Sequence, residues 1–505
     1  METKTIEFLG DFYNGSFQRA KNPDDTWQIS SPSDKKDTVI CPEASFQHIE
    51  EAVASARRAF PSWAHLGLEK RKEYFQRLIE IYQKYENEMA ETIARETGKP
   101  LWEAQTEAKA LSGKINVTIN HSLKRVSEEK VPDALPGVDG YVRYKPRGVM
   151  AVLGPFNFPA HLPNGHIVPA LLTGNTVVFK PSDKTAAVGQ LMAKMFAEAE
   201  FPEGVFNLVQ GRGETGKRLV ASHQVDGILF TGSYEVGLKI KQETLTHYWK
   251  ILALEMGGKN SAIVWEDADL EKAVYENIVG AYLTSGQRCS ATSKIILHKS
   301  IADTFLENFY ETAKKLTIGH WKENAFMGAL VSADSVDNYL RFQEIAKREG
   351  AECIMRGKAL DLSPSGNYVT PSIYKIKEFD PKSVYQQTEI FGPSVSIYTV
   401  NDLETAFAIA NGSSYGLVHS VFTKDRSIYE KALLDIRVGL VNWNRTTNGA
   451  SSKLPFGGMK KSGNDRPSAD FAVYYCTVPV ASLEDLNPFS KEKMFPGISY
   501  QFHQK

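Results

Sequence analysis

The sequence predicts an α/β protein built from two doubly wound α/β domains and a small β-flap. Its 505 residues exceed what a single hydrophobic core usually supports. Short apolar runs alternate with segments in which apolar residues recur every three or four positions, as strands alternate with amphipathic helices. The runs also lack a polar residue at every second position, which is typical of parallel strands buried on both faces.

The N-terminal half predicts the first of these sheets. Residues 46–63 and 68–104 carry apolar residues at three-to-four spacing among many charges, so we expect surface helices there. A short strand at 140–144 precedes the apolar run 149–153, which ends at Gly154-Pro155. Further strands are expected at 176–179, 205–209 and 227–230, with helices at 186–199 and 215–222.

A second alternation predicts the other domain. We expect strands at 262–264, 294–298 and 439–442 and helices at 269–284 and 301–316. The predicted division is residues 1–122 and 146–256 for the first domain, 257–470 for the second, 123–145 and 471–483 for the flap, and 484–505 for an irregular C-terminal tail. Within the flap, residues 141–144 and 472–475 have strand-like composition.

Composition narrows the class of function. Hydrophobic content of 42% and charged content of 24% are typical of globular proteins, and a net charge of −1 provides no field for nucleic acid or an anionic membrane. We therefore expect a small-molecule partner, no nucleic acid and no membrane. The N-terminus has no signal-peptide pattern and no window approaches about 18 apolar residues, so a cytoplasmic location is expected.

The four cysteines, Cys41, Cys289, Cys353 and Cys476, are isolated from one another. Neither a CxxC pair nor a metal-ligand spacing occurs, so we predict no disulfide and no metal site. Each thiol could simply be a small buried hydrophobe. Only the context of a particular cysteine can indicate a catalytic role.

Polar residues follow two of the predicted buried strands. Asn157 lies in the turn after 149–153, and Lys180 and Asp183 follow 176–179. Ligands bind at this carboxyl edge in open α/β sheets, and a Lys donor with an Asp acceptor suits ribose hydroxyls. The alternatives are a turn-forming Asn and a solvated Lys before a helix N-cap.

Two glycine-rich turns could hold a dinucleotide. Residues 211–216 match GxGxxG between a strand and a helix, but the acid expected about 20 residues further on is missing. The next turn, 231–237, offers hydroxyls and helix N-terminal N–H groups that could equally bind a pyrophosphate.

One acid and one thiol have neighbouring residues that favour a catalytic role. Glu255 lies in the apolar, glycine-flanked stretch LEMGG, where burial would raise its pKa toward that of a usable general base. Cys289 closes GQRC beside a flexible glycine, where backbone N–H groups could meet an oxyanion.

In order and spacing these motifs resemble the aldehyde dehydrogenase superfamily, from about Phe8 to Leu483. The resemblance is carried by PFNFP (155–159), FKPSD (179–183), FTGS (230–233), LEMGG (254–258), GQRC (286–289), EIFGP (389–393) and PFGGMKKSG (455–463). It implies NAD(P)-dependent oxidation of an aldehyde to a carboxylic acid, with a Rossmann-like NAD-binding domain, a catalytic domain and a flap used for oligomerisation.

The resemblance also implies roles for individual residues. Cys289 would attack the aldehyde, Asn157 would hold the oxyanion, and Glu255 would activate water to hydrolyse the thioester. Cofactor contacts are expected from Lys180, Asp183, Gly211, Thr231, Gly232, Ser233, Glu389 and Phe391. Asp183 stands where many family members carry Glu, and a carboxylate there favours NAD over NADP, although Lys180 and Lys184 could help to accept a phosphate.

Three further stretches, 161–171, 441–444 and 462–469, together with the Arg before Cys289, resemble one branch of the family whose substrate is a semialdehyde with two carboxylates. Cationic candidates for those carboxylates are Arg288, Arg445, Lys453 and Arg466. Structural ion pairs are the alternative role for the arginines. Other acidic semialdehydes remain open as substrates.

Three competing functions remain: an acylating enzyme that uses coenzyme A, a hydrolytic thiol enzyme, and a non-catalytic relative. The presence of Glu255 and Cys289 argues against the first and the last, and no local sequence places a histidine base beside Cys289 for the second. By resemblance we expect a homodimer, with a tetramer as the alternative.

Overall fold

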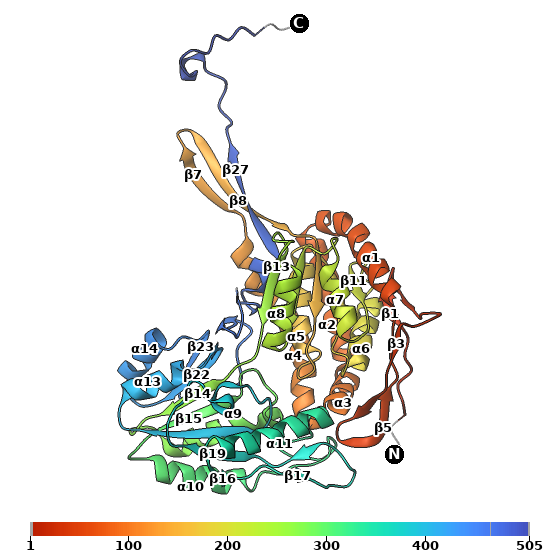
Figure 1. Cartoon of the computed structure of the whole chain (residues 1–505). Coiled ribbons are helices and arrows are strands. Elements are labelled where there is room, and N and C mark those ends of the chain that lie inside the picture. Colours follow the sequence, from red (N-terminus) through yellow and green to blue (C-terminus); the bar gives the residue numbers. More distant parts are fainter. Residues whose placement is uncertain (1–3, 465, 503–505) are drawn as a thin grey trace.

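The computed structural model describes residues 4–464 and 466–502 and confirms the predicted α/β class (Figure 1). Two seven-stranded sheets follow one another along the described chain, and a three-stranded sheet projects from them. The outermost parts of the predicted first domain and of the tail, residues 1–3 and 503–505, lie outside the described residues, as does Asp465.

The first sheet contains all four strands predicted between 149 and 230. Its order is β13-β12-β9-β10-β11-β1-β2, and the chain leaves β9 toward β10 and β11 on one side and toward β12 and β13 on the other. The five central strands are parallel, while β1 and β2 add an antiparallel edge. The bounds are β1 (Asp11–Tyr13), β2 (Ser16–Gln18), β9 (Val149–Leu153), β10 (Thr176–Lys180), β11 (Phe206–Leu208), β12 (Gly227–Thr231) and β13 (Ile251–Glu255).

Helices cover both faces of this sheet, which explains its continuous apolar strands. Met150 and Val152 point into a core formed with α2 to α6, and Val149 and Ala151 point into one formed with α1, α7 and α8. The helices are α1 (Phe46–His65), α2 (Leu68–Lys84), α3 (Glu86–Thr97), α4 (Leu101–Asn120), α5 (His161–Leu172), α6 (Ala186–Glu198), α7 (Gly213–Ala221) and α8 (Tyr234–Glu243).

The predicted helical region 68–104 consists of separate helices, with one break at Tyr85, between α2 and α3, and a second at Gly98, between α3 and α4. Gly98 ends α3 in the left-handed conformation, with φ of 76°, and Pro100 begins α4. The last of these helices then continues to Asn120, well beyond the predicted end.

The second sheet has the order β16-β19-β20-β15-β14-β22-β23 and is parallel except for β16. Its strands are β14 (Asn260–Val264), β15 (Thr292–His298), β16 (Glu352–Met355), β19 (Ser372–Ile376), β20 (Ser394–Val400), β22 (Val418–Phe422) and β23 (Leu440–Trp443). One face packs on α9 (Leu270–Tyr282) and α10 (Ala302–Ala313), and the other on α11 (Ala333–Arg348), α13 (Leu403–Asn411) and α14 (Arg426–Asp435).

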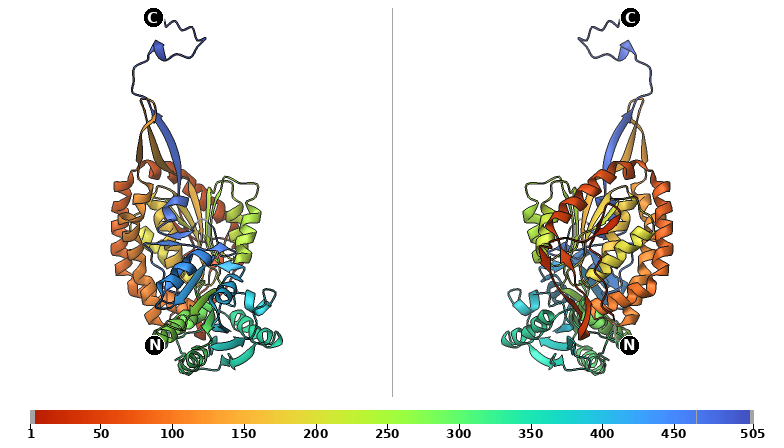
Figure 2. Two further views of the ribbon diagram at one scale, coloured as in Figure 1. Left: turned by 90° about the vertical axis from the view of Figure 1, so that its left-hand side faces the viewer. Right: turned by 90° about the vertical axis from the view of Figure 1, so that its right-hand side faces the viewer.

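The flap is the sheet β27-β8-β7, formed by β7 (Glu129–Leu135), β8 (Val138–Pro146) and β27 (Thr477–Glu484). The predicted strand at 472–475 is wrong: these residues form the short helix α15 (Ala472–Tyr475), which buries Ala472, Val473 and Tyr475. Strand pairing begins only at Thr477, where exposed and partly buried residues start to alternate. Figures 1 and 2 show the flap projecting from the body with the tail beyond it.

Short elements complete the fold: β3 (Asp25–Thr26), β4 (Ile29–Ser31), β5 (Asp34–Ile40), β6 (Glu43–Ala44), β17 (Ala359–Leu360), β18 (Tyr368–Val369), β21 (Tyr415–Gly416), β24 (Pro455–Phe456), β25 (Met459–Lys460), β26 (Ser468–Ala469) and α12 (Val384–Gln387). Among the described residues, no helix combines the length and the apolar character needed to cross a bilayer.

Candidate active site

Polar residues lie at the carboxyl ends of four neighbouring parallel strands of the first sheet, and therefore at one edge of that sheet. Lys180, Thr231 and Glu255 are the last residues of β10, β12 and β13, and Asn157 lies in the turn after β9. This edge lies beside β9, where the strand order reverses and where ligands bind in doubly wound folds. The chain runs from β13 almost directly into β14, so the edge meets the start of the second sheet.

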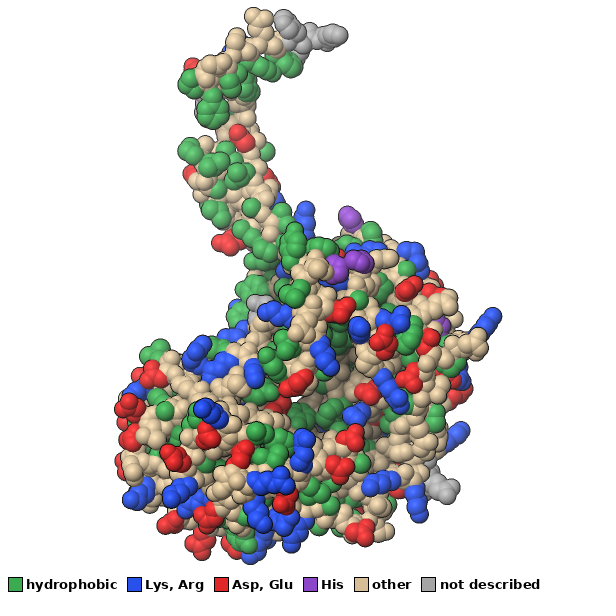
Figure 3. Space-filling model, in the orientation of Figure 1, with side chains coloured by type: hydrophobic (Ala, Val, Ile, Leu, Met, Phe, Trp, Pro, Cys, Tyr) green, Lys and Arg blue, Asp and Glu red, His purple; other side chains and the backbone are tan. Residues whose placement is uncertain are grey.

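A cavity of about 1240 Å³ lies between the two halves and is lined from both. The surface is hollowed there in Figure 3. The predicted site residues that line it are Asn157, Lys180, Asp183, Thr231, Gly232, Ser233, Glu255, Cys289, Glu389 and Phe391. The fold therefore gathers residues that lie up to 234 positions apart in the sequence, from Asn157 to Phe391.

Cys289 lies at the end of a strained turn before β15. Thr284, Ser285 and Gly286 have φ of 57°, 54° and 71°, and a β-branched residue rarely adopts this left-handed conformation. The side-chain amide of Asn260 donates to the carbonyl of Cys289 at 2.7 Å and fixes the loop beyond the turn. Burial, together with the nearby Glu255 carboxylate, raises the pKa of the Cys289 thiol well above its ordinary value. The thiol therefore needs a base to become a nucleophile.

The carboxyl group of Glu255 is the titratable group beside the Cys289 thiol. Glu255 is only 1% exposed, and neither carboxylate oxygen has a hydrogen-bond partner among the described residues. Burial raises the pKa of Glu255 to about 8. A carboxylate left unpaired in this way is poised to exchange a proton near neutral pH.

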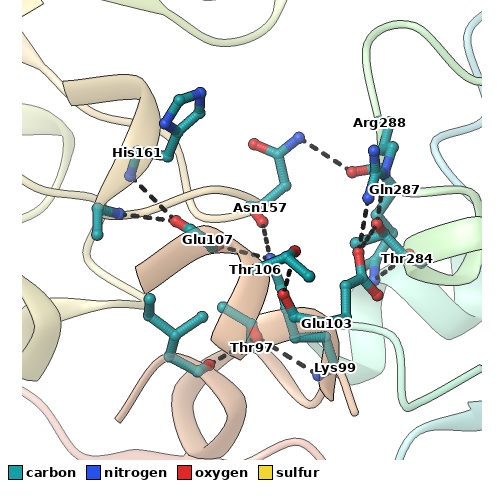
Figure 4. A network of polar contacts seen from close by, with 12 residues as sticks. Thr97, Lys99, Glu103, Thr106, Glu107, Asn157, His161, Thr284, Gln287 and Arg288 are labelled. Atoms are coloured by element: carbon teal, nitrogen blue, oxygen red, sulfur yellow. Dashed lines mark hydrogen bonds and ion pairs between the residues drawn. The ribbon is translucent and has the colours of Figure 1, made fainter. Parts of the chain in front are cut away.

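Asn157 is held from both ends. Its side-chain amide donates to the carbonyl of Gln287 at 3.0 Å, which joins it to the loop that carries Cys289 (Figure 4). The backbone carbonyl of Asn157 accepts a hydrogen bond from the ammonium of Lys99 at 2.7 Å. A primary amide has two N–H groups, so one remains to stabilise an oxyanion formed at Cys289.

The groups around Lys180 fit the ribose and phosphates of a dinucleotide. The Lys180 ammonium is buried, donates to the carbonyl of Pro181 at 2.8 Å, and has a pKa lowered to about 8 by burial. Asp183 lines the cavity close by. Ser233 is the N-cap of α8. Because Gly232 and Ser233 both line the cavity, the N-terminus of this helix faces it.

Glu389 and Phe391 come from the loop before β20. The backbone N–H of Gly258 donates to Glu389 at 2.7 Å, and burial raises the pKa of Glu389 to about 8. A Cβ on Gly257 would lie 1.9 Å from this carboxylate, which explains the first glycine of the pair in LEMGG. Phe391 has φ of 55°, an unusual conformation for a bulky residue, and contacts the Phe156 ring with centroids 5.7 Å apart.

Five predicted residues do not line this cavity. One of them, Arg466, donates to the backbone carbonyl of Gly458 at 3.1 Å. Gly211, with φ of 149°, packs so closely on Thr215 that a Cβ would lie 1.9 Å from its hydroxyl, while its neighbours Arg212 and Gly213 do line the cavity. Arg288 is paired with Glu103 at 2.8 Å, and Arg445 and Lys453 are exposed at the surface.

Sequence reasoning did not identify Lys99, Glu103 or Glu107, which lie around the loops that carry Asn157 and Cys289 (Figure 4). Lys99 precedes α4, and Glu103 and Glu107 lie one turn apart on that helix, all at most 3% exposed. A carboxylate pair at i, i+4 immediately after a Gly-Lys-Pro break was the available signal. No cluster of three or more His, Cys, Asp or Glu that could hold a metal occurs within the described ranges.

The fold and the site define a class of enzymes, the aldehyde dehydrogenases. A model of the aldehyde dehydrogenase family matches residues 18–479, and the chain belongs to this family. The resemblance described above is thereby confirmed.

Particular relatives are also similar over most of the chain. N-succinylglutamate 5-semialdehyde dehydrogenase of Chromobacterium violaceum is 40% identical over 458 residues, which cover 90% of this chain and 93% of that protein. The protein of the same name from Enterobacter sp. (strain 638) is 38% identical over 461 residues, covering 91% and 92%.

Among solved structures, 1-pyrroline-5-carboxylate dehydrogenase from Thermus with bound NAD superposes with a TM-score of 0.89 at 30% identity, covering 95% of this chain and 93% of that one. Lactaldehyde dehydrogenase from Escherichia coli superposes with a TM-score of 0.89 at 27% identity, covering 95% of this chain and 100% of that one.

Proposed function

We propose that this protein oxidises N-succinyl-L-glutamate 5-semialdehyde to N-succinyl-L-glutamate with NAD, as a step of arginine catabolism. The observation that carries the proposal is the presence of Cys289, Glu255 and Asn157 at one cavity that also presents dinucleotide-binding groups. The names of relatives at about 40% identity support this choice of substrate.

The first step is attack of the Cys289 thiolate on the aldehyde carbon. Because burial raises the pKa of this thiol, its proton must pass to a neighbouring base, and Glu255 is the unpaired carboxylate beside it. The carbonyl oxygen becomes the oxyanion of a thiohemiacetal. The free N–H of the Asn157 amide and the backbone N–H of Cys289 stabilise that oxyanion.

The second step converts the thiohemiacetal to a thioester and then to the acid. Bound NAD supplies the acceptor for the hydride that leaves the substrate carbon. Glu255, once it has released the proton taken from Cys289 to solvent, takes a proton from water, which attacks the thioester carbon and releases the Cys289 thiolate and the carboxylic acid. A hydrolytic role for Glu255 is the reason to prefer this reaction to acyl transfer to coenzyme A.

The residues around Lys180 would hold the cofactor, with Asp183 favouring NAD. Lys180 and Asp183 would bind the adenosine ribose, the α8 N-terminus at Ser233 the pyrophosphate, and Glu389 the nicotinamide ribose, with Phe391 against the nicotinamide. A carboxylate at Asp183 repels a 2′-phosphate.

The two substrate carboxylates require cations at the mouth of the site. We propose that Arg288 or Arg445 contacts one of them, with Lys453 as a further candidate. Arg288 immediately precedes Cys289, and its guanidinium lies over the Phe158 ring at 4.8 Å, next to the Asn157 turn. Neutralising each arginine in turn tests this assignment, and unchanged kcat/KM for the dicarboxylate substrate in both variants would overturn it.

A substrate panel tests the proposed function. NAD and NADP reduction would be measured with N-succinylglutamate semialdehyde, glutamate semialdehyde, succinate semialdehyde and propanal, with Cys289→Ala as the control. The highest kcat/KM is expected for the first substrate with NAD and no activity for the variant. Preference for another semialdehyde would reassign the substrate. Failure to oxidise any aldehyde would favour a non-catalytic relative, and full activity of Cys289→Ala would refute the mechanism.

A further inference from the structure

We propose that Glu103 is a positioning residue, which holds the strained turn before Cys289 and so presents the thiol to the aldehyde. The inference rests on the proposed function in taking Cys289 as the nucleophile. It goes further because Glu103 lies outside the cavity and touches neither Cys289 nor the residues of the predicted cofactor site.

Glu103 joins two side chains of the nucleophile loop. It is 1% exposed on α4, and its Oε1 accepts hydrogen bonds from the Thr284 hydroxyl and from Nη2 of Arg288, the latter at 2.8 Å. Nε of Arg288 in turn donates to the Thr284 hydroxyl at 2.6 Å. The three side chains form a closed triangle (Figure 4). The turn is therefore linked to a helix 181 positions earlier in the sequence.

The turn needs this support because of its backbone. Thr284 and Ser285 both have positive φ, and non-glycine residues keep that conformation only where their surroundings over-determine it. The Ser285 hydroxyl donates to the carbonyl of Gly328 at 2.8 Å, and the Gln287 side chain accepts from the backbone N–H of Val331 at 3.0 Å. The Thr284 side chain is held by the Glu103–Arg288 pair.

The same helix also holds the oxyanion side of the site. Glu107, one turn after Glu103, accepts from the backbone N–H groups of Ala160 and His161 at 3.0 and 3.1 Å. Its other oxygen accepts from Lys99 at 2.9 Å, and Lys99 donates to the carbonyl of Asn157. One rigid element thus sets the positions of the Asn157 amide and the Cys289 thiol relative to each other.

The charge of the buried Glu103 carboxylate, opposite the Arg288 guanidinium, is the feature that a substitution can remove. Replacing Glu103 with Gln keeps the size of the side chain but removes the negative charge opposite the Arg288 guanidinium. The turn would then lose the ion pair that holds it, and the Cys289 thiol could move. A displacement of about 1 Å at a reacting group lowers the rate about 100-fold. We expect a loss in kcat with little change in the affinity for NAD, because the cofactor residues do not contact Glu103.

The main experiment measures kcat, KM and NAD affinity in full-length Glu103→Gln, Thr284→Val and the double variant. Each single variant is expected to lower kcat about 10- to 100-fold, with the Kd for NAD within about twofold of the unsubstituted protein. Because the two side chains act together, the double variant should be no worse than the worse single one. Thr284→Ser keeps the hydroxyl and should restore activity, which a purely steric role for Thr284 would not predict.

Glu96→Gln serves as the matched control. Glu96 is also 1% exposed and accepts two backbone hydrogen bonds, from Ala187 and Val188, but it touches neither catalytic loop. It should leave kcat within about twofold. If Glu103→Gln does not fold, Thr284→Val, which retains the β-branched shape, decides the question. Normal kcat in a folded Glu103→Gln or in Thr284→Val overturns the proposal.

A second readout separates this proposal from the proposed function. Iodoacetamide labelling of the cofactor-free protein, followed peptide by peptide, reports the environment of Cys289 without an aldehyde. Glu103→Gln should change the Cys289 labelling rate at least about threefold, whereas the exposed Cys41 and Cys353 should label as before. If no aldehyde is oxidised but the labelling changes as expected, the proposed function fails, whereas the role of Glu103 in positioning Cys289 stands. Unchanged Cys289 labelling overturns the role of Glu103.

Discussion

The carboxylate of Glu255 is buried without a hydrogen-bond partner among the described residues, and this costs the folded state free energy. The sequence could predict the residue, because a lone acid in the apolar stretch LEMGG must be buried. It could not predict the unpaired state of both oxygens, which depends on the loops that surround them. The same limit applies to Glu103, whose partners Thr284 and Arg288 lie more than 180 positions away.

The pKa of Glu255 predicts how activity depends on pH. Since burial raises this pKa to about 8, only about a tenth of the carboxyl groups are ionised at pH 7, and the base form increases with pH. We expect kcat to rise about tenfold per pH unit between pH 6 and 7.5 and to level off above about 8. A kcat profile that is flat from pH 6 to 9 would argue against Glu255 as the base.

The same shift predicts that Glu255→Gln stabilises the protein. The folded-state pKa of about 8 lies above the ordinary 4.5, so the unfolded chain loses its proton first and folding becomes less favourable as pH rises from about 4.5 to 8. At pH 7 the neutral glutamine should raise the free energy of unfolding by about 3 kcal/mol, and at pH 5 by less than about 1 kcal/mol. Urea unfolding at both pH values measures the difference, and equal effects would contradict it.

At the scale of elements, the ends of parallel strands account for most of the site. Lys180, Thr231 and Glu255 each close an apolar run, so the sequence pattern locates them at one edge. Helix α4 was harder to interpret, because the break at Gly98 hid its start and its function lies in long-range contacts. The segment 472–475 was misassigned because four apolar residues fit a strand and a helical turn equally well.

The turn after β10 predicts how cofactor preference can be altered. Asp183 lines the cavity next to Lys180 and Lys184, so removing its charge would leave two cations at the proposed site of the adenosine ribose. Asp183→Ser should raise the ratio of kcat/KM for NADP to that for NAD by about tenfold or more. Initial rates with both cofactors measure the ratio, and Glu214→Ser, a second carboxylate at the cavity, serves as a comparison. An unchanged ratio in Asp183→Ser would exclude the proposed repulsion.

At the scale of the whole molecule, the flap lacks a core of its own. Both of its outer strands, β7 and β27, have one unpaired edge in the described chain, and Val131, Leu135, Val478 and Leu483 are exposed on them. Such edges are normally covered. The sequence could predict the two-sheet body from its alternating pattern, but the position of the flap depends on pairing between segments about 340 residues apart.

We propose that a second copy of the chain covers the flap in a homodimer. Sedimentation velocity should then give about twice the chain mass of 56.3 kDa. Deletion of residues 477–505, which removes β27, should yield monomers, whereas deletion of 485–505 leaves the strand in place and should preserve the dimer. Full-length protein that sediments as a monomer at micromolar concentration would contradict this assembly.

Single-turnover chemistry in Glu255→Gln tests the central claim most directly. The variant lacks the base for both steps. Mixed with NAD and N-succinylglutamate semialdehyde, it should therefore release at most one NADH per active site, more slowly than the unsubstituted protein, and then stop, since the thioester on Cys289 cannot be hydrolysed. Peptide mass spectrometry should place the acyl group on Cys289 alone. Continued turnover at the unsubstituted rate, or an acyl group on another residue, would contradict the account.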